Sequence, residues 1–185
     1  MFGVILFRAQ PYHNGHKHMI ETAFEECREL GIPLYIFIGS ANKFGTIRNP
    51  LPIYLRKMLI EEDLKETYTP EELCNIHVVT LDDLSDEANN NISWGDYLYE
   101  KIKEVAGVSN FIFYYSDKPD IILSWFSTLR DKIYFKFMSR YGNYNATDIR
   151  KRILLAETAE ELEDFIPNST LNNFIHIKDY IERAR

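Results

Sequence analysis

The sequence has few of the residues that cross-link small folds or ligate structural metals. Two cysteines, Cys27 and Cys74, occur among 185 residues, and they do not show the C-x-x-C spacing of zinc sites. We therefore expect neither a zinc centre nor a disulfide framework, and the pattern favours a reducing, cytoplasmic setting. Internal repeats and low-complexity linkers are also missing, so we expect one domain spanning residues 1–185.

Long apolar runs and an excess of positive charge are missing as well. No run approaches the length of a membrane span, and no basic leader precedes the first apolar segment, so we expect no signal peptide and no membrane partner. The 21 Lys and Arg residues face 28 Asp and Glu residues, and the net charge of -7 argues against a general nucleic-acid-binding protein. A nucleotide enzyme remains compatible, because it needs only a local positive pocket.

The sequence does contain a regular alternation of apolar strands and amphipathic helices. Such alternation requires right-handed crossovers and predicts an α/β, Rossmann-like fold, with a mostly parallel five-stranded sheet covered on both faces. A C-terminal helix is expected after a cap at Asn168 or Ser169. The predicted strands are 2–7, 34–38, 76–81, 111–115 and 133–137, and the predicted helices between them are 15–30, 52–65 and 94–105.

The strongest functional signal is the segment 7–16, F-R-A-Q-P-Y-H-N-G-H, directly after the first predicted strand. His13 and His16 lie three residues apart where a helix begins, so their side chains share one face beside unpaired backbone N–H groups. Gly15 permits close approach of a ligand, and Arg8 supplies a permanently charged, forked donor. The segment predicts a site for a nucleotide triphosphate. An ordinary helix cap is the alternative interpretation.

A second phosphate-binding pattern lies at residues 144–153, Y-N-A-T-D-I-R-K-R-I. Asn145 or Thr147 can cap a helix there, and Arg150 follows one turn later. Taken alone, this segment is better explained by an ordinary capped surface helix. Together with the first motif, it predicts two helix N-termini that grip one triphosphate from opposite sides.

Residues between the two motifs are expected at the same edge of the sheet. Ligands of parallel sheets bind at the carboxyl ends of the strands, so segment 40–49 and Ser116 should converge on the first motif. Gly39 and Ser40 end the second predicted strand with small residues, and Arg48 offers another forked cation. The alternatives are a plain surface turn for this loop and a core position for the isolated Trp94.

Four ordered segments together resemble the nucleotidylyltransferase superfamily, and within it the archaeal-type nicotinamide-mononucleotide adenylyltransferases, including versions fused to Nudix domains. Besides the H-x-G-H string, residues 145–150 resemble S/N-x-T-x-[I/V]-R. Residues 38–50, I-G-S-A-N-K-F-G-T-I-R-N-P, resemble the loop I-G-S-A-x(5)-I-R-[D/N]-P, and Asn91 and Trp94 resemble N-x-x-W. The resemblance extends over residues 3–155.

The resemblance implies that ATP and nicotinamide mononucleotide are joined to give NAD and pyrophosphate. The phosphate acceptor is already ionised, so positioning and charge stabilisation suffice and no protein nucleophile is needed. The implied catalytic residues are His13, His16, Arg8, Arg48 and Arg150. The implied ATP-binding residues are Gln10, Gly15, Asn145 and Thr147, and the implied acceptor-binding residues are Gly39, Ser40, Asn91 and Trp94, with the tryptophan stacked on the nicotinamide ring.

The cofactor expected from this chemistry is Mg²⁺ held mainly by the ATP phosphates, without a protein ligand. The expected partners are the two small-molecule substrates, and a homo-oligomer is compatible with the sequence. Other acceptors within the superfamily remain open, namely pantetheine phosphate, FMN chemistry or a phospho-alcohol, although Arg150 and the missing R-T-x-G-I-S-T-T string argue against the first and the last. A non-catalytic nucleotide sensor is a further alternative, and the sequence does not distinguish nicotinamide from nicotinate mononucleotide.

Overall fold

The computed structural model of the chain describes residues 1–84, 91–107, 110–116, 119–142 and 144–185, with the side chains of residues 91 and 92 also outside the description. At its centre is one parallel sheet of five strands in the order β3-β2-β1-β4-β5. The predicted parallel α/β architecture is confirmed. The strands are β1 (Gly3–Phe7), β2 (Leu34–Ile38), β3 (Ile76–Thr80), β4 (Phe111–Tyr115) and β5 (Ile133–Phe137).

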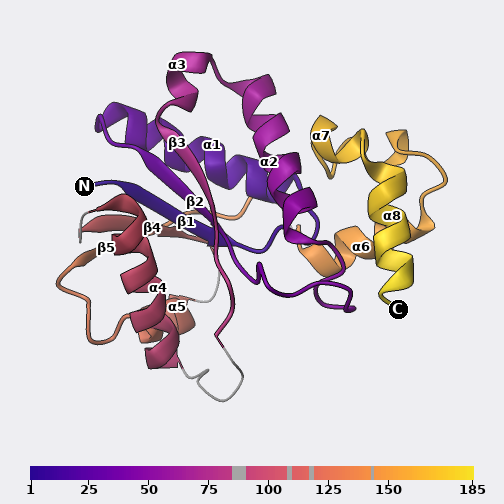
Figure 1. Cartoon of the computed structure of the whole chain (residues 1–185). Helices are drawn as coiled ribbons and strands as arrows, with labels where there is room; N and C mark the ends of the chain where they lie inside the picture. Colours follow the sequence, from indigo (N-terminus) through magenta and orange to yellow (C-terminus); the bar gives the residue numbers. More distant parts are fainter. Residues whose placement is uncertain (85–90, 108–109, 117–118, 143) are drawn as a thin grey trace.

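Helices cover both faces of the sheet, and each face has its own core (Figure 1). Strand side chains alternate between the two cores: in β2, Ile36 and Ile38 face the core beneath α1 and α2, whereas Phe37 joins the core beneath α4. The helices are α1 (Asn14–Glu29), α2 (Ile53–Thr67), α3 (Pro70–Leu73), α4 (Asn91–Ala106), α5 (Pro119–Trp125), α6 (Ala146–Leu155), α7 (Asn168–Leu171) and α8 (Phe174–Arg183), with a 3-10 turn at Glu160–Leu162.

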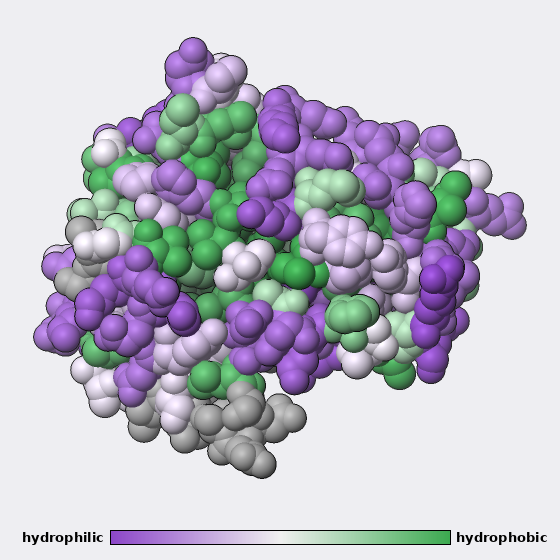
Figure 2. Space-filling view, in the orientation of Figure 1, coloured by the Kyte–Doolittle hydropathy of each residue, from purple (hydrophilic) through white to green (hydrophobic). Residues whose placement is uncertain are grey.

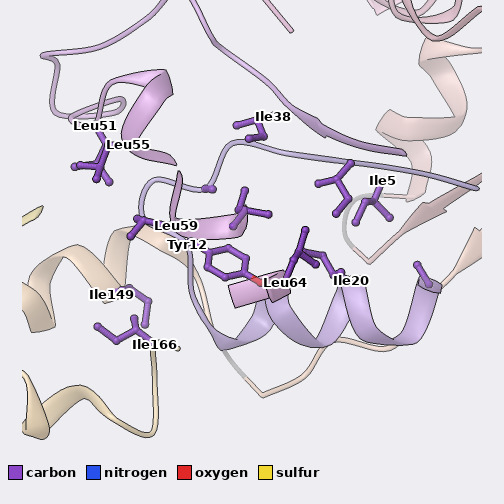
Figure 3. Close-up of a cluster of buried hydrophobic side chains, with 14 of the residues drawn as sticks. Ile5, Tyr12, Ile20, Ile38, Leu51, Leu55, Leu59, Leu64, Ile149 and Ile166 are labelled. Atoms are coloured by element: carbon purple, nitrogen blue, oxygen red, sulfur yellow. The ribbon is translucent and has the colours of Figure 1, made fainter. Parts of the chain in front are cut away.

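The larger core extends under the first loop of the chain. The ring of Tyr12 lies among apolar side chains of α1, α2 and α6, including Ile20, Leu59 and Ile149 (Figure 3). Its hydroxyl donates to Asp63 of α2 at 2.8 Å. The Tyr12 side chain therefore anchors the loop between β1 and α1 in the core.

The C-terminal segment forms two short helices instead of the single predicted one. The chain turns between α7 and α8 at Asn173, which has a non-helical ψ of 13°. Thr170 is buried and donates from Oγ1 to the Tyr12 carbonyl at 3.1 Å, and Asn173 Nδ2 donates to the Ser169 carbonyl at 2.9 Å. One of these hydrogen bonds is tertiary and the other is local, and both lie at the break. The expected cap at Asn168 or Ser169 is not the start of α8, whose cap position is Asn173.

The strand order reverses between β1 and β4, because successive strands are added outward on one side as β2 and β3 and on the other as β4 and β5. Ligands of open α/β sheets bind at such a switch point, beyond the carboxyl ends of the strands. Ala9 and Ser40, which follow β1 and β2 there, have φ values of 51° and 54°. Among the helices that the structure describes, none is long and apolar enough to cross a membrane.

Candidate active site

A cavity of about 730 Å³ opens at the switch point, and it is lined by the ends of the strands and the starts of α1 and α6. It brings together residues that are more than one hundred positions apart in the chain. Figure 2 shows apolar side chains gathered between hydrophilic ones near the middle of the visible face. The predicted site residues that line the cavity are Arg8, His13, Gly15, His16, Gly39, Ser40, Arg48, Trp94 and Asn145.

The two motif histidines are stacked on each other at the start of α1. Their ring centroids are 3.7 Å apart with an interplanar angle of 29°. Burial lowers the pKa of His13 to about 4, and burial followed by the neighbouring His13 lowers the pKa of His16 well below its ordinary value. The Nδ1 atoms of both rings are buried without a hydrogen-bond partner among the described residues. The free protein therefore presents two neutral imidazoles with unused polar atoms.

The start of α1 is held by the segment that follows α6. The Asn14 backbone N–H donates to the Phe165 carbonyl at 3.0 Å, and its side chain donates to the Asp164 carbonyl at 3.1 Å. Gly15 leaves room for the histidine pair, because a Cβ there would lie 3.1 Å from two ring atoms of His13. The glycine thus sets the position of the His13 ring.

A buried arginine that the motifs do not include joins the ends of β1 and β2. Arg56 is fully buried in α2 and donates to the carbonyls of Arg8, Gly39 and Ser40 at 2.8, 2.8 and 2.9 Å. Burial lowers its pKa to about 10. A signal in the sequence could have identified it: Arg56 lies four residues before the apolar Ile60, on the face of the predicted helix that packs inward.

Two further arginines, Arg8 and Arg48, line the cavity, where Asp83 is the one carboxylate among the described lining residues. Burial and the neighbouring Arg48 lower the pKa of Arg8, and Asp83 opposes the shift. Asp83 accepts a hydrogen bond from Ser40 Oγ at 3.0 Å. Since both guanidinium groups lie near each other and keep permanent charge, this part of the cavity is suited to a polyphosphate.

A hydrogen bond joins the second motif to the loop that carries the first motif. Asn145 caps α6, because its Oδ1 accepts from the Asp148 N–H at 2.9 Å, as expected for one of the two proposed caps. Arg150 donates to the Gln10 carbonyl at 2.7 Å and to Thr147 Oγ1 at 3.3 Å. The first of these hydrogen bonds joins the two phosphate-binding patterns, and the second lies within α6.

Three of the predicted site residues lie beside the cavity instead of lining it. These are Gln10, Thr147 and Arg150. The Gln10 side chain is paired in both directions with the backbone of Leu51, at 3.1 Å to the carbonyl and 2.9 Å from the N–H. Their roles in ATP binding stay predictions. Asn91 is the first residue of α4, and its side chain lies outside the described part of the structure.

The far end of the cavity is aromatic. Trp94 of α4 meets Trp125 of α5 edge to face, with ring centroids 6.1 Å apart and an interplanar angle of 79°. Both tryptophans line the cavity, together with Ile121 and Ile122. Helices α4 and α5 approach closely because Gly95 has no Cβ, which would overlap the backbone of Trp125. Sequence reasoning missed Trp125, because the seven-residue helix that carries it is too short for a periodic signal.

We compared the chain with family models and with the sequences of known proteins, and the two comparisons agree with each other. The family model described as cytidylyltransferase-like matches residues 8–152. A protein of Thermococcus sibiricus named nicotinamide-nucleotide adenylyltransferase is 30% identical over 185 residues, which cover 100% of this chain and 88% of that protein. A protein of the same name from Methanococcus aeolicus is 28% identical over 172 residues, covering 93% and 87% of the two chains.

The fold is also found in solved structures. A bifunctional NMN adenylyltransferase/ADP ribose pyrophosphatase from Francisella tularensis, complexed with AMP and Mn ion, matches with a TM-score of 0.74 and 22% identity. The match covers 100% of this chain and 52% of the other, so this chain spans about half of the bifunctional protein. A putative nicotinate-nucleotide adenylyltransferase from Vibrio parahaemolyticus matches with a TM-score of 0.61 and 17% identity, over 98% and 97% of the two chains.

Proposed function

Because the chain belongs to the cytidylyltransferase-like family, we propose that it transfers the adenylyl group of ATP to nicotinamide mononucleotide, giving NAD and pyrophosphate. The single observation that carries this proposal is the composition of one cavity: stacked neutral histidines, more arginine than carboxylate side chains among the described lining residues, and two tryptophans. The relatives named nicotinamide-nucleotide adenylyltransferase support the same activity along the whole chain.

The reaction is a direct, in-line displacement. A phosphate oxygen of nicotinamide mononucleotide forms a bond to the α-phosphorus of ATP, and the bond from that phosphorus to the bridging oxygen of the β-phosphate breaks. The pyrophosphate leaves with the electron pair. The attacking oxygen is already ionised, so the protein needs to position the two phosphates and stabilise charge, and no side chain has to act as a nucleophile. Neither Cys27 nor Cys74 lines the cavity.

Different side chains in and beside the cavity bind different phosphate groups of the substrates. His13 and His16 bind the α- and β-phosphates at the positive end of α1. Arg8 and Arg48 bridge the phosphates on both sides of the reacting bond. Arg150, together with the start of α6, takes the β- and γ-phosphates by exchanging its present contact with the Gln10 carbonyl for a phosphate oxygen.

The acceptor ring lies at the aromatic end. Trp94 offers its face to the cationic pyridinium ring, and an electron-rich indole is the side chain best suited to such a contact. Trp125 stands edge-on to Trp94 and closes this end of the cavity. Gly39 and Ser40 then lie beside the phosphate of the acceptor, where their small size leaves room for it.

ATP enters this reaction as its Mg²⁺ complex. Among the residues described, the structure shows no group of three or more His, Cys, Asp or Glu side chains that could hold a metal ion. Mg²⁺ keeps several waters and needs few protein ligands, so the phosphate oxygens of ATP would hold it. When bound, the ion would neutralise part of the charge that develops on the leaving pyrophosphate. The chain's own cations, Arg8 and Arg48, act on the same oxygens from the protein side.

The test is an acceptor panel. The full chain is incubated with MgATP and, separately, nicotinamide mononucleotide, nicotinate mononucleotide, pantetheine phosphate and riboflavin 5′-phosphate, and released pyrophosphate is measured. We expect release with nicotinamide mononucleotide, matched by an equal amount of NAD. The His16→Asn variant should lose about a hundredfold in turnover, and the His176→Asn variant, altered at an exposed position outside the cavity, should keep it. ATP binding without pyrophosphate from any acceptor would indicate a sensor instead.

A further inference from the structure

One negatively charged side chain stands in a cavity that is otherwise cationic. Of the described residues that line the cavity, Asp83 alone carries a carboxylate, whereas Arg8, Lys43, Arg48 and Arg140 carry positive charge. A carboxylate weakens the binding of every phosphate group near it. Its presence in a polyphosphate site therefore calls for a role that a neutral side chain would not fulfil.

Asp83 is held in a fixed position. Its backbone N–H donates to Asn42 Oδ1 at 3.0 Å, and Asn42 Nδ2 donates back to the Asp83 carbonyl at 3.2 Å. Ser40 Oγ donates to the carboxylate oxygen Oδ1 at 3.0 Å. A carboxylate has about four acceptor positions, so the bond from Ser40 leaves Asp83 with capacity for another donor.

Asp83 lines the same cavity as Arg8 and Arg48 and as Trp94 of the aromatic end. Its charge opposes the lowering of the Arg8 pKa. The cavity-lining Leu84 follows it in the chain, and the Tyr97 hydroxyl donates to the carbonyl of Asp82, the residue before it, at 3.1 Å. The Tyr97 ring centroid is 5.6 Å from that of Trp94. Asp83 therefore borders the space that the proposed function gives to the pyridine ring.

We propose that Asp83 makes the acceptor site selective for a pyridine mononucleotide with a neutral amide over one with a carboxylate. This inference rests on the proposed function. A carboxylate accepts a hydrogen bond from the N–H₂ of nicotinamide and attracts the cationic ring, but it repels the carboxylate of nicotinate. The penalty is large because a site that is partly closed to water screens like charges poorly. Selectivity then comes mainly from rejecting the wrong acceptor.

The test compares two acceptors in one enzyme. The kcat and KM values for nicotinamide and nicotinate mononucleotide are measured at saturating MgATP with the full chain and with Asp83→Asn. The asparagine Oδ1 still accepts from Ser40, so the shape of the site is kept while the charge is removed. We expect the full chain to prefer the amide by about tenfold or more in kcat/KM, and the variant to lose most of that preference through a lower KM for nicotinate mononucleotide.

Two further variants separate charge from shape. Asp82→Asn removes the same charge from the exposed neighbouring side chain, which does not line the cavity, and it should leave the preference unchanged. Asp83→Glu keeps the charge and should keep a preference for the amide. A purely structural role of Asp83, such as holding Arg8, would instead lower kcat/KM equally for both acceptors.

The outcomes are distinguishable. If the full chain uses nicotinamide mononucleotide but Asp83→Asn leaves the ratio of the two kcat/KM values unchanged, the inference is overturned and the proposed function stands. A full chain that prefers nicotinate would overturn the inference in the same way. If the full chain uses neither acceptor, the proposed function fails and the inference fails with it.

Discussion

The Arg56 guanidinium donates from Nη2 to the backbone carbonyl of Ser40 at 2.9 Å. The other terminal nitrogen, Nη1, donates to the carbonyls of Arg8 and Gly39, both at 2.8 Å. One buried side chain thus holds the ends of β1 and β2, from which Arg8 and Ser40 extend into the cavity. Because Ala9 and Ser40 both have positive φ values, which are costly for residues with a Cβ, these ends depend on such support.

Replacing Arg56 by methionine tests this support. The variant leaves three carbonyl groups without their charged donor, and we expect the free energy of unfolding to fall by about 3 kcal/mol or more. The value is measured by urea unfolding at pH 7. The matched control is Lys57→Met, which removes the cation of a partly exposed pair with Glu61 at 3.6 Å and should change stability by about 0.5 kcal/mol or less. Equal effects of the two variants would contradict the role of Arg56.

The buried histidines predict a specific pH dependence of stability. The pKa of His13 in the folded protein is about 4, below its ordinary value of 6.5, so between these pH values the unfolded chain binds a proton that the folded chain does not. The free energy of unfolding should therefore fall as pH is lowered through this window, by about 3 kcal/mol for His13 alone. His16 acts in the same direction because burial also lowers its pKa.

The measurement is urea unfolding at several pH values between about 4.5 and 7.5, which covers most of the interval between the folded pKa of His13, about 4, and its ordinary value of 6.5. The His13→Asn/His16→Asn double variant lacks both titrating groups and should show a flatter profile than the full chain. His176→Asn, altered at an exposed position, serves as the control and should follow the full chain. Identical slopes for the double variant and the full chain would show that the two imidazoles do not govern the pH dependence.

Gly15 sets the position of the His13 ring, so Gly15→Ala should damage activity more than stability. The added Cβ would lie 3.1 Å from His13 Cε1 and Nδ1 and 3.3 Å from the Cβ of Tyr144, which forces the ring to move by a few tenths of an ångström. We expect adenylyl transfer to fall about tenfold or more. Alanine favours the helix, so the midpoint of thermal unfolding should change little. Glu25→Ala, at an exposed position in α1, should affect neither property, and unchanged activity of Gly15→Ala would refute the positioning role.

Arg150 should act on ATP and not on the acceptor. Its guanidinium now contacts the Gln10 carbonyl at 2.7 Å, and the proposed function has it move to a phosphate oxygen. Arg150→Ala is expected to lower kcat/KM for ATP by about a hundredfold. The exposed neighbour Lys151, whose pair with Asp148 spans 3.6 Å, provides the control variant Lys151→Ala with near-normal kinetics. If Arg150→Ala turned over ATP normally, the arginine would have only its structural role.

The elements that sequence reasoning located well are those that depend on local patterns. Strands β2, β4 and β5 begin and end at the predicted residues, because each is a short apolar run bounded by turn residues. The cap at Asn145 was also expected, since an asparagine before a helical pattern satisfies the free N–H groups of the first turn. The parallel topology then follows from the alternation of strands and helices.

Features that depend on distant partners were not predictable in the same way. The position of Arg56 relative to Ile60 indicates an inward-facing side chain, but not its partner, because Arg8 lies 48 positions away in the sequence. Tyr12, the partner of Asp63, lies 51 positions away. The break at Asn173 also involves a distant partner, because the buried Thr170 before it donates to the Tyr12 carbonyl, 158 positions away in the sequence. For Asp83, neither its neighbours nor its spacing indicates that it is the carboxylate of the cavity.

The most direct test of adenylyl transfer follows the configuration of the reacting phosphorus. The full chain is given nicotinamide mononucleotide and ATP made chiral at the α-phosphorus by sulfur substitution, and the dinucleotide product is analysed by ³¹P NMR. Direct attack by the acceptor predicts one equivalent of pyrophosphate and a product with inverted configuration at that phosphorus. Retained configuration would require a covalent adenylyl-enzyme, and it would contradict a cavity that acts only by positioning and charge, as would the absence of any dinucleotide.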